Sequence, residues 1–281
     1  MKAKIHNVIS CIIYMVLFII SNIPLSILYS LSILFVIANK IIKYRERIID
    51  KNIDIAFPNK NMDQKLKIKN LFYKNLYFTI IEIIKSITFK QKDIISRIQI
   101  QNSNEIMNVL KSNQSVILIS SHYANWEWLM LRISLMSHNN IAAVYKPLSN
   151  RYINNIMLKI RTKFNANIVP ISNWKGFLLR NKSKPFIYML VADQSPIKSN
   201  AVTIPFFKKN TLFHNGPEKM QKILNSDVFY ADLIKLKNGY YNLTFKRLDK
   251  NNITKDYVSH LSCTIKTNPQ YWLWSHNRWK R

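Results

Sequence analysis

The 281-residue chain contains only three glycines, Gly176, Gly216 and Gly239. Glycine-rich loops that bind dinucleotides or nucleoside triphosphates need several closely spaced glycines, so the sequence excludes both kinds of loop. The two cysteines, Cys11 and Cys263, stand near opposite ends, and the sequence has no Cys-x-x-Cys pair or Cys/His cluster. A disulfide framework and a structural zinc site are therefore not expected.

Acidic residues are also scarce. Asp and Glu together number 14 against 42 for Lys and Arg, which gives a formal net charge of +28. This imbalance says nothing about the fold, but it predicts acidic partners such as nucleic acid, anionic lipid or an acidic protein. Apolar residues make up 48% of the chain. That content and the length are sufficient for a folded domain with a hydrophobic core.

One long stretch has no charge at all. No Asp, Glu, Lys or Arg occurs between Lys4 and Lys40, and residues 8–38 are mostly apolar. A membrane-spanning helix needs about 20 apolar residues. Pro24 would kink such a helix, so the stretch predicts either one kinked span or a shallow hairpin. The run is too long for a typical cleaved signal peptide, and no Ala-x-Ala site follows it.

We therefore predict a retained membrane anchor over residues 1–40, followed by a single folded domain over residues 41–281. Orientation follows from the basic residues that flank the anchor. Lys2 and Lys4 precede the apolar run, whereas a larger group follows it: Lys40, Lys43, Arg45 and Arg47. This excess predicts that the folded domain is cytoplasmic.

After the anchor, the hydrophobic pattern is typical of an α/β protein. Short apolar strands are predicted over 115–120, 141–146, 167–171, 185–192, 201–207, 227–237 and 240–248. Helices are predicted over 62–87, 125–137, 150–164, 216–224, 255–267 and 270–281. Strands that alternate with helices predict a mixed, mostly parallel sheet flanked by helices.

The segment 120–128 carries the most informative chemistry. His122 follows a predicted strand, and Glu127 lies in the first turn of the predicted helix after it. Strand ends in open α/β sheets are where ligands bind. A neutral imidazole whose other ring nitrogen binds a carboxylate is suited to remove a proton from a hydroxyl. Spacing alone leaves open a core histidine that is satisfied by a nearby carboxylate.

Several blocks in order resemble the lipid A biosynthesis acyltransferases, within the wider lysophospholipid acyltransferase superfamily. The blocks are HYANWEW (122–128), ADQSP (192–196), FF (206–207), GPEKM (216–220) and PQYWLWSHNRWK (269–280). Residues 44–60 also resemble the family's segment that follows its anchor. The match covers nearly the whole chain, and it is far more specific than the spacing of His122 and Glu127.

The resemblance implies transfer of a fatty acyl chain from acyl carrier protein to a hydroxyl of a lipid A precursor. It places this reaction at the cytoplasmic face of the bacterial inner membrane, with no metal or bound cofactor. It makes His122 the general base and Glu127 its orienting partner. Arg161 falls where the family has an arginine, and it would hold an acceptor phosphate or stabilise the oxyanion. The alternative for Arg161 is one more charge on a basic helix.

Two further residues are candidates for substrate binding. Asp193 ends a predicted strand, so it lies at the same end of the sheet as His122, although a turn-forming Asp-x-Ser-Pro fits equally well. Asn125 either caps the following helix or lines the site. The remaining histidines, His138 among them, lack the spacing of metal ligands.

The sequence departs from the family pattern in its glycines. Ala124 stands where the related motif has glycine, which is a small change. Lys208 stands where family members often have glycine, and a required positive φ would be uncomfortable there.

Three other functions remain open at this point. The same chemistry would serve a lysophospholipid, glycerol phosphate or another glycolipid as the acceptor. Another possibility, suggested by the scarcity of glycine, is that the chain is a decayed, inactive homologue. A membrane-anchored nucleic-acid binder would show a concentrated basic stripe or a known binding module. The lysines here are dispersed, so nucleic acid is not an expected partner. The partners that the resemblance implies are acyl carrier protein, a membrane lipid acceptor and the membrane.

Overall fold

A seven-stranded sheet forms the centre of the computed structural model, which describes the backbone of residues 2–137 and 140–280. His138 lies outside these residues. The strands are Ile98–Ile100 (β1), Val116–Ser120 (β2), Ile141–Tyr145 (β3), Asn167–Pro170 (β4), Ile187–Val191 (β5), Asp227–Lys237 (β8) and Tyr240–Arg247 (β9). Their order is β1-β9-β8-β2-β5-β3-β4, with β8–β9 antiparallel and the other neighbours parallel. The predicted mixed, mostly parallel sheet is confirmed.

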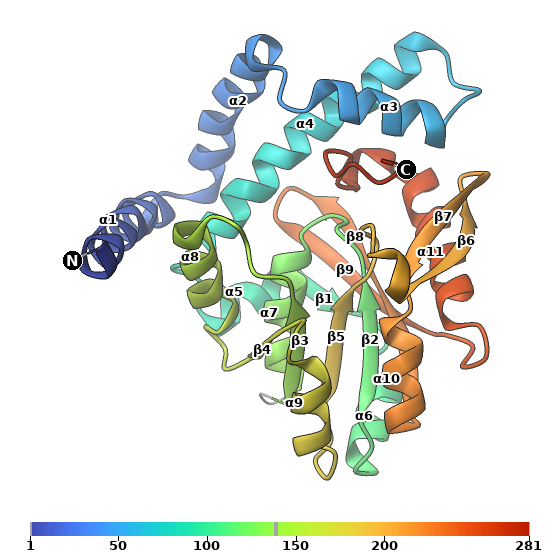
Figure 1. Ribbon diagram of the computed structural model, residues 1–281. Coiled ribbons are helices and arrows are strands. Elements are labelled where there is room, and N and C mark those ends of the chain that lie inside the picture. The colour runs from blue at the N-terminus through green and yellow to red at the C-terminus, as the bar shows by residue number, and fades with distance from the viewer. Residues whose placement is uncertain (1, 138–139, 281) are drawn as a thin grey trace.

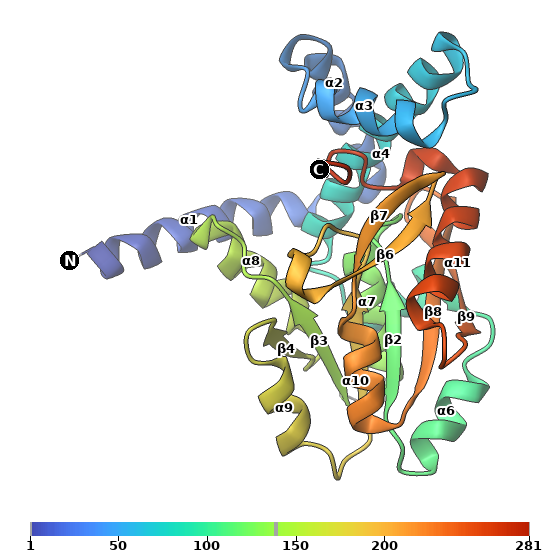
Figure 2. The same cartoon turned by 45° about the vertical axis from the view of Figure 1, so that its right-hand side comes forward.

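Helices cover both faces of this sheet (Figures 1 and 2). Helices α9 (Trp174–Arg180) and α10 (Gly216–Leu224) lie in front of the strands in Figure 1, and α7 (Trp126–Met136) lies behind them. The other helices of this part are α5 (Gln91–Arg97), α6 (Asn104–Lys111), α8 (Arg151–Arg161) and α11 (Ile253–Thr267). Every residue of β2 is buried, as expected for a central strand that is covered on both faces.

The N-terminal stretch forms two helices, α1 (Lys2–Asn22) and α2 (Leu25–Ile42), which run in different directions (Figure 2). Pro24 lacks the N–H that would continue α1. The Lys85 ammonium donates to the Ser21 and Ile23 carbonyls, so the broken helix end is satisfied by the folded domain. Only α2, within the described part of the chain, is long and apolar enough to cross a membrane.

A buried carboxylate joins α2 to the rest of the molecule. Glu82, on α4 (Met62–Lys85), is completely buried. It accepts hydrogen bonds from Tyr29 of α2, from the Gly239 N–H in the β8–β9 turn, and from Tyr241 and Asn125. Ordinarily an uncompensated buried carboxylate is very costly. Here its donors come from three separate segments, α2, the β8–β9 hairpin and the start of α7, so Glu82 fixes the positions of those segments relative to one another.

A second, smaller sheet is a hairpin of β6 (Ala201–Phe206) and β7 (Lys209–His214). The strand predicted over 201–207 is therefore followed by a strand that the hydrophobic pattern did not reveal. Phe206 pairs with Lys209, so Phe207 and Lys208 form the turn, with φ of 50° and 60°. Two-residue hairpin turns of this kind favour Asn-Gly because both positions have positive φ.

The helix predicted over 270–281 is wrong for the described residues of that segment. After α11, the chain makes a short 3₁₀ turn (Pro269–Tyr271) and then continues irregularly. The Leu273 N–H donates to the His122 carbonyl, and Tyr123 and Trp272 form a bridge. Backbone groups of this segment are thus bonded to the loop after β2. In a helix they would instead bond to one another. Helix α3 (Glu46–Ala56) packs nearby, and its Asn52 donates to the Trp274 carbonyl.

We expect Lys208→Gly to stabilise the fold. An L-residue in the left-handed region costs about 1–2 kcal/mol, and part of that gain is offset by the greater freedom of glycine in the unfolded chain. The net gain should be about 0.5–1 kcal/mol, measured by thermal unfolding in detergent. Lys208→Ala is the matched control, because it removes the same charge but keeps the Cβ. Equal effects of the two variants would contradict relief of backbone strain.

Glu82→Gln should destabilise the protein strongly. The glutamine would turn its NH₂ group, itself a donor, toward donors that the Glu82 carboxylate accepts from in the wild type. Each buried donor left without a partner costs about 1–3 kcal/mol. Glu105→Gln provides the control, since Glu105 forms an exposed ion pair with Arg247. Exposed pairs contribute less than about 1 kcal/mol. Comparable shifts in melting temperature for the two variants would contradict the structural role of Glu82.

Candidate active site

Two parallel strands bring His122 and Asp193 together. β2 and β5 are neighbours, and Ser120 pairs with Val191 at their carboxyl ends. His122 and Asp193 each follow two residues later, so they leave the sheet side by side. The His122 Nδ1 lies 2.7 Å from Asp193 Oδ1, and the His122 backbone N–H donates to Oδ2 at 3.0 Å.

The Asp193 carboxylate is almost fully buried and has a third donor, the indole N–H of Trp272 at 2.8 Å. Burial alone would raise the pKa of this carboxyl. The charge on His122 and the hydrogen bonds from His122 and Trp272 outweigh burial, so the pKa lies below its ordinary value. Asp193 is therefore ionised at neutral pH and stabilises a positive charge on the His122 ring.

The other ring nitrogen of His122 faces the opposite direction. Nε2 lies 3.2 Å from the side-chain nitrogen of Gln194. A carboxylate on Nδ1 favours the tautomer that carries its proton on Nδ1. Nε2 then has a free lone pair, which accepts from Gln194. The ring remains partly exposed, with 20% of the side chain accessible.

Glu127 and Arg161 form a second charged pair. Glu127 lies in the first turn of α7, and Arg161 ends α8. The Arg161 Nε donates to Glu127 Oε2 at 2.8 Å, and Nη2 donates to Oε1 at 2.5 Å. Burial alone would lower the pKa of Arg161, but Glu127 reverses that effect and raises it. This two-point geometry is the strong form of an arginine–carboxylate pair.

The predicted pairing of His122 with Glu127 needs correction, because the carboxylate on the His122 ring belongs to Asp193. The reason is topological. Asp193 leaves the strand next to β2 at the same height as His122, whereas Arg161 of the adjacent helix binds both oxygens of Glu127. Trp126 links the two pairs, because its ring lies 5.1 Å from the His122 ring and its indole N–H donates to Glu127.

Asn125 caps α7, which is the first of the two roles that the sequence offered for it. Its side-chain oxygen accepts from the Trp128 N–H, and its amide nitrogen donates to Glu82. The residue is completely buried. Both ends of its amide are thus engaged at the start of α7, the helix that carries Glu127.

Comparisons with known proteins identify the family of this chain. A sequence profile of the bacterial lipid A biosynthesis acyltransferases matches residues 3–281. The chain belongs to this family. It is 19% identical over 251 residues to the lipid A biosynthesis palmitoleoyltransferase of Escherichia coli K12, covering 86% of this chain and 81% of that protein. The lipid A biosynthesis acyltransferase of Shigella flexneri matches with the same identity and coverage. The protein is therefore an acyltransferase of lipid A biosynthesis.

The acyltransferase blocks that lie far apart in the sequence meet around Asp193. Trp272, from the C-terminal block, donates to Asp193, and Ser195 donates to the Arg278 carbonyl at 2.9 Å. Arg278 is almost completely buried, where its Nη2 donates to the Leu212 carbonyl. Burial lowers the pKa of Arg278 to about 10. Sequence reasoning missed Gln194, Trp272 and Arg278 as parts of the site, although all three lie in the blocks that carry the resemblance.

Both departures from the acyltransferase glycine pattern fall at positive φ. Ala124 has a φ of 53° and is buried in the loop after β2, two residues after His122. Its N–H donates to the Tyr271 carbonyl at 2.9 Å, which holds the strained conformation in place. The interpretation of Ala124 as a small change is therefore incomplete, because alanine pays a conformational cost that glycine avoids. Lys208 has the same geometry, as the sequence suggested.

His276 provides a pH-dependent contribution to stability. Burial, together with the charges of His122, Arg278 and Lys280, outweighs the effect of Asp193 and lowers the pKa of His276 from 6.5 to about 4. The folded state therefore favours the neutral ring, while the unfolded chain takes up a proton below pH 6.5. The stabilisation that His276 contributes is therefore fully present above pH 6.5, and it is lost as the pH falls from 6.5 toward about 4.

We expect His276→Gln to flatten this part of the stability profile, measured by thermal unfolding between pH 7 and about 4. Asp193 acts in a lower window, because its stabilisation is lost only as the pH falls below its unfolded value of 3.8. If the stability of His276→Gln fell with pH as steeply as that of the wild type between pH 6.5 and about 4, His276 would not be the group responsible.

Proposed function

We propose that this acyltransferase moves a fatty acyl chain from the thioester of acyl carrier protein to a hydroxyl of a lipid A precursor, with His122 as general base. The observation that supports this mechanism is the His122–Asp193 pair at the carboxyl end of the parallel sheet. It combines an ionised, buried carboxylate with an imidazole whose ring is partly exposed.

In the proposed step, the acceptor hydroxyl takes the place of the Gln194 amide at Nε2. Nε2 accepts the hydroxyl proton as the oxygen bonds to the thioester carbon. Asp193 stabilises the resulting imidazolium through Nδ1. The tetrahedral intermediate then collapses, the carbon–sulfur bond breaks, and the imidazolium returns its proton to the thiolate. Direct transfer of this kind needs no covalent acyl-enzyme.

Arg161 is proposed to act on the substrate while Glu127 positions it. Glu127 occupies Nε and Nη2, so Nη1 is the nitrogen that would contact an acceptor phosphate or the oxyanion. A guanidinium held at two points is restricted in orientation, and such preorganisation increases its effect on developing charge. Glu127 thus keeps its place in the proposed machinery with a different role.

We also propose that the anchor over residues 1–40 holds the domain of residues 41–281 at the cytoplasmic face of the bacterial inner membrane. Support comes from the apolar α2 helix and the basic residues that follow it. A positive flank of this kind favours the cytoplasmic side.

An acyl transfer assay on membranes that contain the protein tests this function. Labelled acyl carrier protein thioester would be offered with a tetraacyl lipid A precursor and, in parallel, a lysophospholipid. Label in the lipid A precursor is the expected result. Label in the lysophospholipid alone would overturn the acceptor and keep the chemistry, and transfer to neither would overturn both donor and acceptor.

Double-mutant cycles distinguish the two charged pairs. We expect His122→Ala and Asp193→Asn each to lower kcat by about 10²–10⁴-fold. Because the two residues act as a unit, the double variant should be little worse than His122→Ala alone. Glu127→Gln and Arg161→Gln should be non-additive with each other in the same way.

The combination of His122→Ala with Glu127→Gln decides between the two partners. Effects that multiply would place Glu127 outside the histidine unit, as proposed. A double variant no worse than His122→Ala would instead return Glu127 to the role of orienting carboxylate. His260→Ala, a change outside the site, should leave kcat near the wild-type value.

A further inference from the structure

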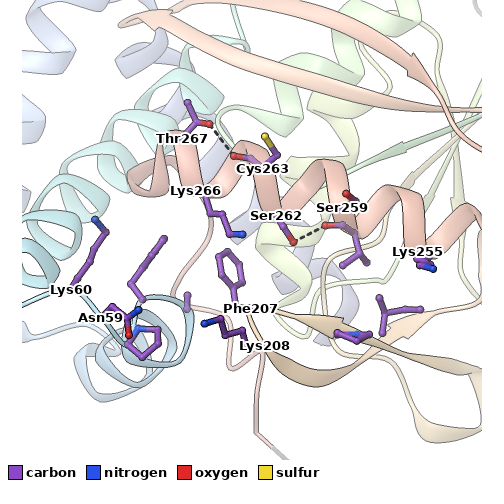
Figure 3. Close-up of a pocket in the computed structure, with 16 residues that line it drawn as sticks. Asn59, Lys60, Phe207, Lys208, Lys255, Ser259, Ser262, Cys263, Lys266 and Thr267 are labelled. Atoms are coloured by element: carbon purple, nitrogen blue, oxygen red, sulfur yellow. Dashed lines mark hydrogen bonds between the residues drawn. The ribbon is translucent and has the colours of Figure 1, made fainter.

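A wide groove lies between three segments that are distant in sequence (Figure 3). One wall is a face of α11, another is the loop at residues 57–60 after α3, and the third is the tip of the β6–β7 hairpin. Its volume is about 970 Å³. The floor and walls contain apolar side chains from each segment, including Phe57, Phe207 and Val258.

The groove is strongly basic. Lys60, Lys208, Lys255 and Lys266 line it, and the described residues around it include no carboxylate. None of these lysines takes part in an ion pair within the described part of the chain. Lys255 and Lys266 stand eleven positions apart on α11, which corresponds to about 16 Å along the helix. The four positive charges thus surround an elongated space.

The hairpin tip is held in the groove at a conformational cost. Phe207 and Lys208 both have positive φ. Phe207 is fixed by Phe57, with ring centroids 5.6 Å apart, and the Lys266 ammonium lies 6.0 Å from the centroid of the Phe207 ring. Strained backbone persists where the surrounding structure enforces it, and such strain is concentrated at functional surfaces.

An aromatic cluster connects this groove to the active site. Phe207 contacts Phe206, and the Phe206 ring lies 5.8 Å from the Trp272 ring. Trp272 donates its indole N–H to Asp193, which holds His122. A partner bound at the hairpin tip would therefore contact the layer of side chains that supports the catalytic pair.

We propose that the groove formed by Lys60, Lys208, Lys255 and Lys266 is the docking surface for an acidic protein, the carrier that brings the acyl thioester. This inference rests on the proposed function, in which the donor is carrier-borne. Charges spread over about 16 Å exceed the reach of one phosphate but match an acidic helix that presents several carboxylates. The exposed apolar side chains that would contact lipid are concentrated on α1 and α2 instead.

Donor comparison tests the proposal. The double variant Lys255→Glu/Lys266→Glu should raise KM for the carrier-borne acyl thioester about tenfold or more, with kcat nearly unchanged. With acyl coenzyme A or a short acyl-pantetheine thioester, which lack the carrier protein, KM should stay at the wild-type value. Added salt should raise the wild-type KM for the carrier-borne donor only.

Lys182→Glu/Lys184→Glu is the matched control, because it reverses the same number of charges on exposed lysines between α9 and β5. It should leave KM for both donors unchanged. An equal rise in KM for the carrier-borne donor in both double variants would show that net charge causes the effect. Equal losses with both donors in the Lys255/Lys266 variant would place those lysines in general substrate binding. Either result would overturn the docking surface.

Cys263 provides a second readout that does not depend on activity. Cys263 is one of the residues that line the groove and it is exposed, and Cys11 can be removed as Cys11→Ser. In the full-length protein in detergent, acyl carrier protein should slow the alkylation of Cys263, and salt should restore the rate. Protection by phosphatidylglycerol vesicles but not by acyl carrier protein would assign the surface to the membrane and overturn the proposal.

The two readouts separate this proposal from the proposed function. Protection of Cys263 without acyl transfer to any acceptor would keep the docking surface and reject the function. Acyl transfer from the carrier-borne donor without protection of Cys263 would keep the function and reject the docking surface.

Discussion

The Asp193 carboxylate is the interaction on which the site depends. It accepts two hydrogen bonds from His122 and one from Trp272, so one buried charge joins the ends of β2 and β5 to the C-terminal segment. An uncompensated buried charge would be very unfavourable, and its three donors make it tolerable. The same contacts set the tautomer of His122. The same buried group therefore contributes both to the stability of the fold and to the orientation of the His122 ring.

Glu82 plays a comparable part at the N-terminal end of the molecule. It accepts hydrogen bonds from Tyr29 of α2 and from Asn125 at the start of α7. Asn125 in turn caps the helix that carries Glu127, and Glu127 holds Arg161. The position of α2 and the position of the Glu127–Arg161 pair are thus linked through buried polar contacts, which have fixed directions and tolerate little displacement.

The scarcity of glycine has local consequences in this acyltransferase. Ala124 and Lys208 occupy left-handed backbone at positions where glycine would be free of strain. The hydrogen bond from Ala124 to Tyr271 holds the first position, and the aromatic contacts of Phe207 with Phe57 and Trp279 hold the hairpin tip. Tertiary packing thus compensates for residues that are locally unfavourable.

The sequence by itself determined the α/β class, the long α4 helix, most strands of the sheet and the apolar N-terminal stretch. These features depend on local periodicity, which a buried strand or an amphipathic helix displays directly. It also placed His122, Asp193, Glu127 and Arg161 among the candidates, because motif blocks and strand ends are local. Only the tertiary structure decided that Asp193, and not Glu127, binds His122. Asp193 reaches His122 because β5 lies beside β2, and Glu127 turns to Arg161 because α8 packs near α7. The irregular C-terminal segment was mispredicted as a helix for the same reason. Its backbone groups bond to the loop after β2, and contacts between residues that are distant in the chain leave no periodic trace in the sequence.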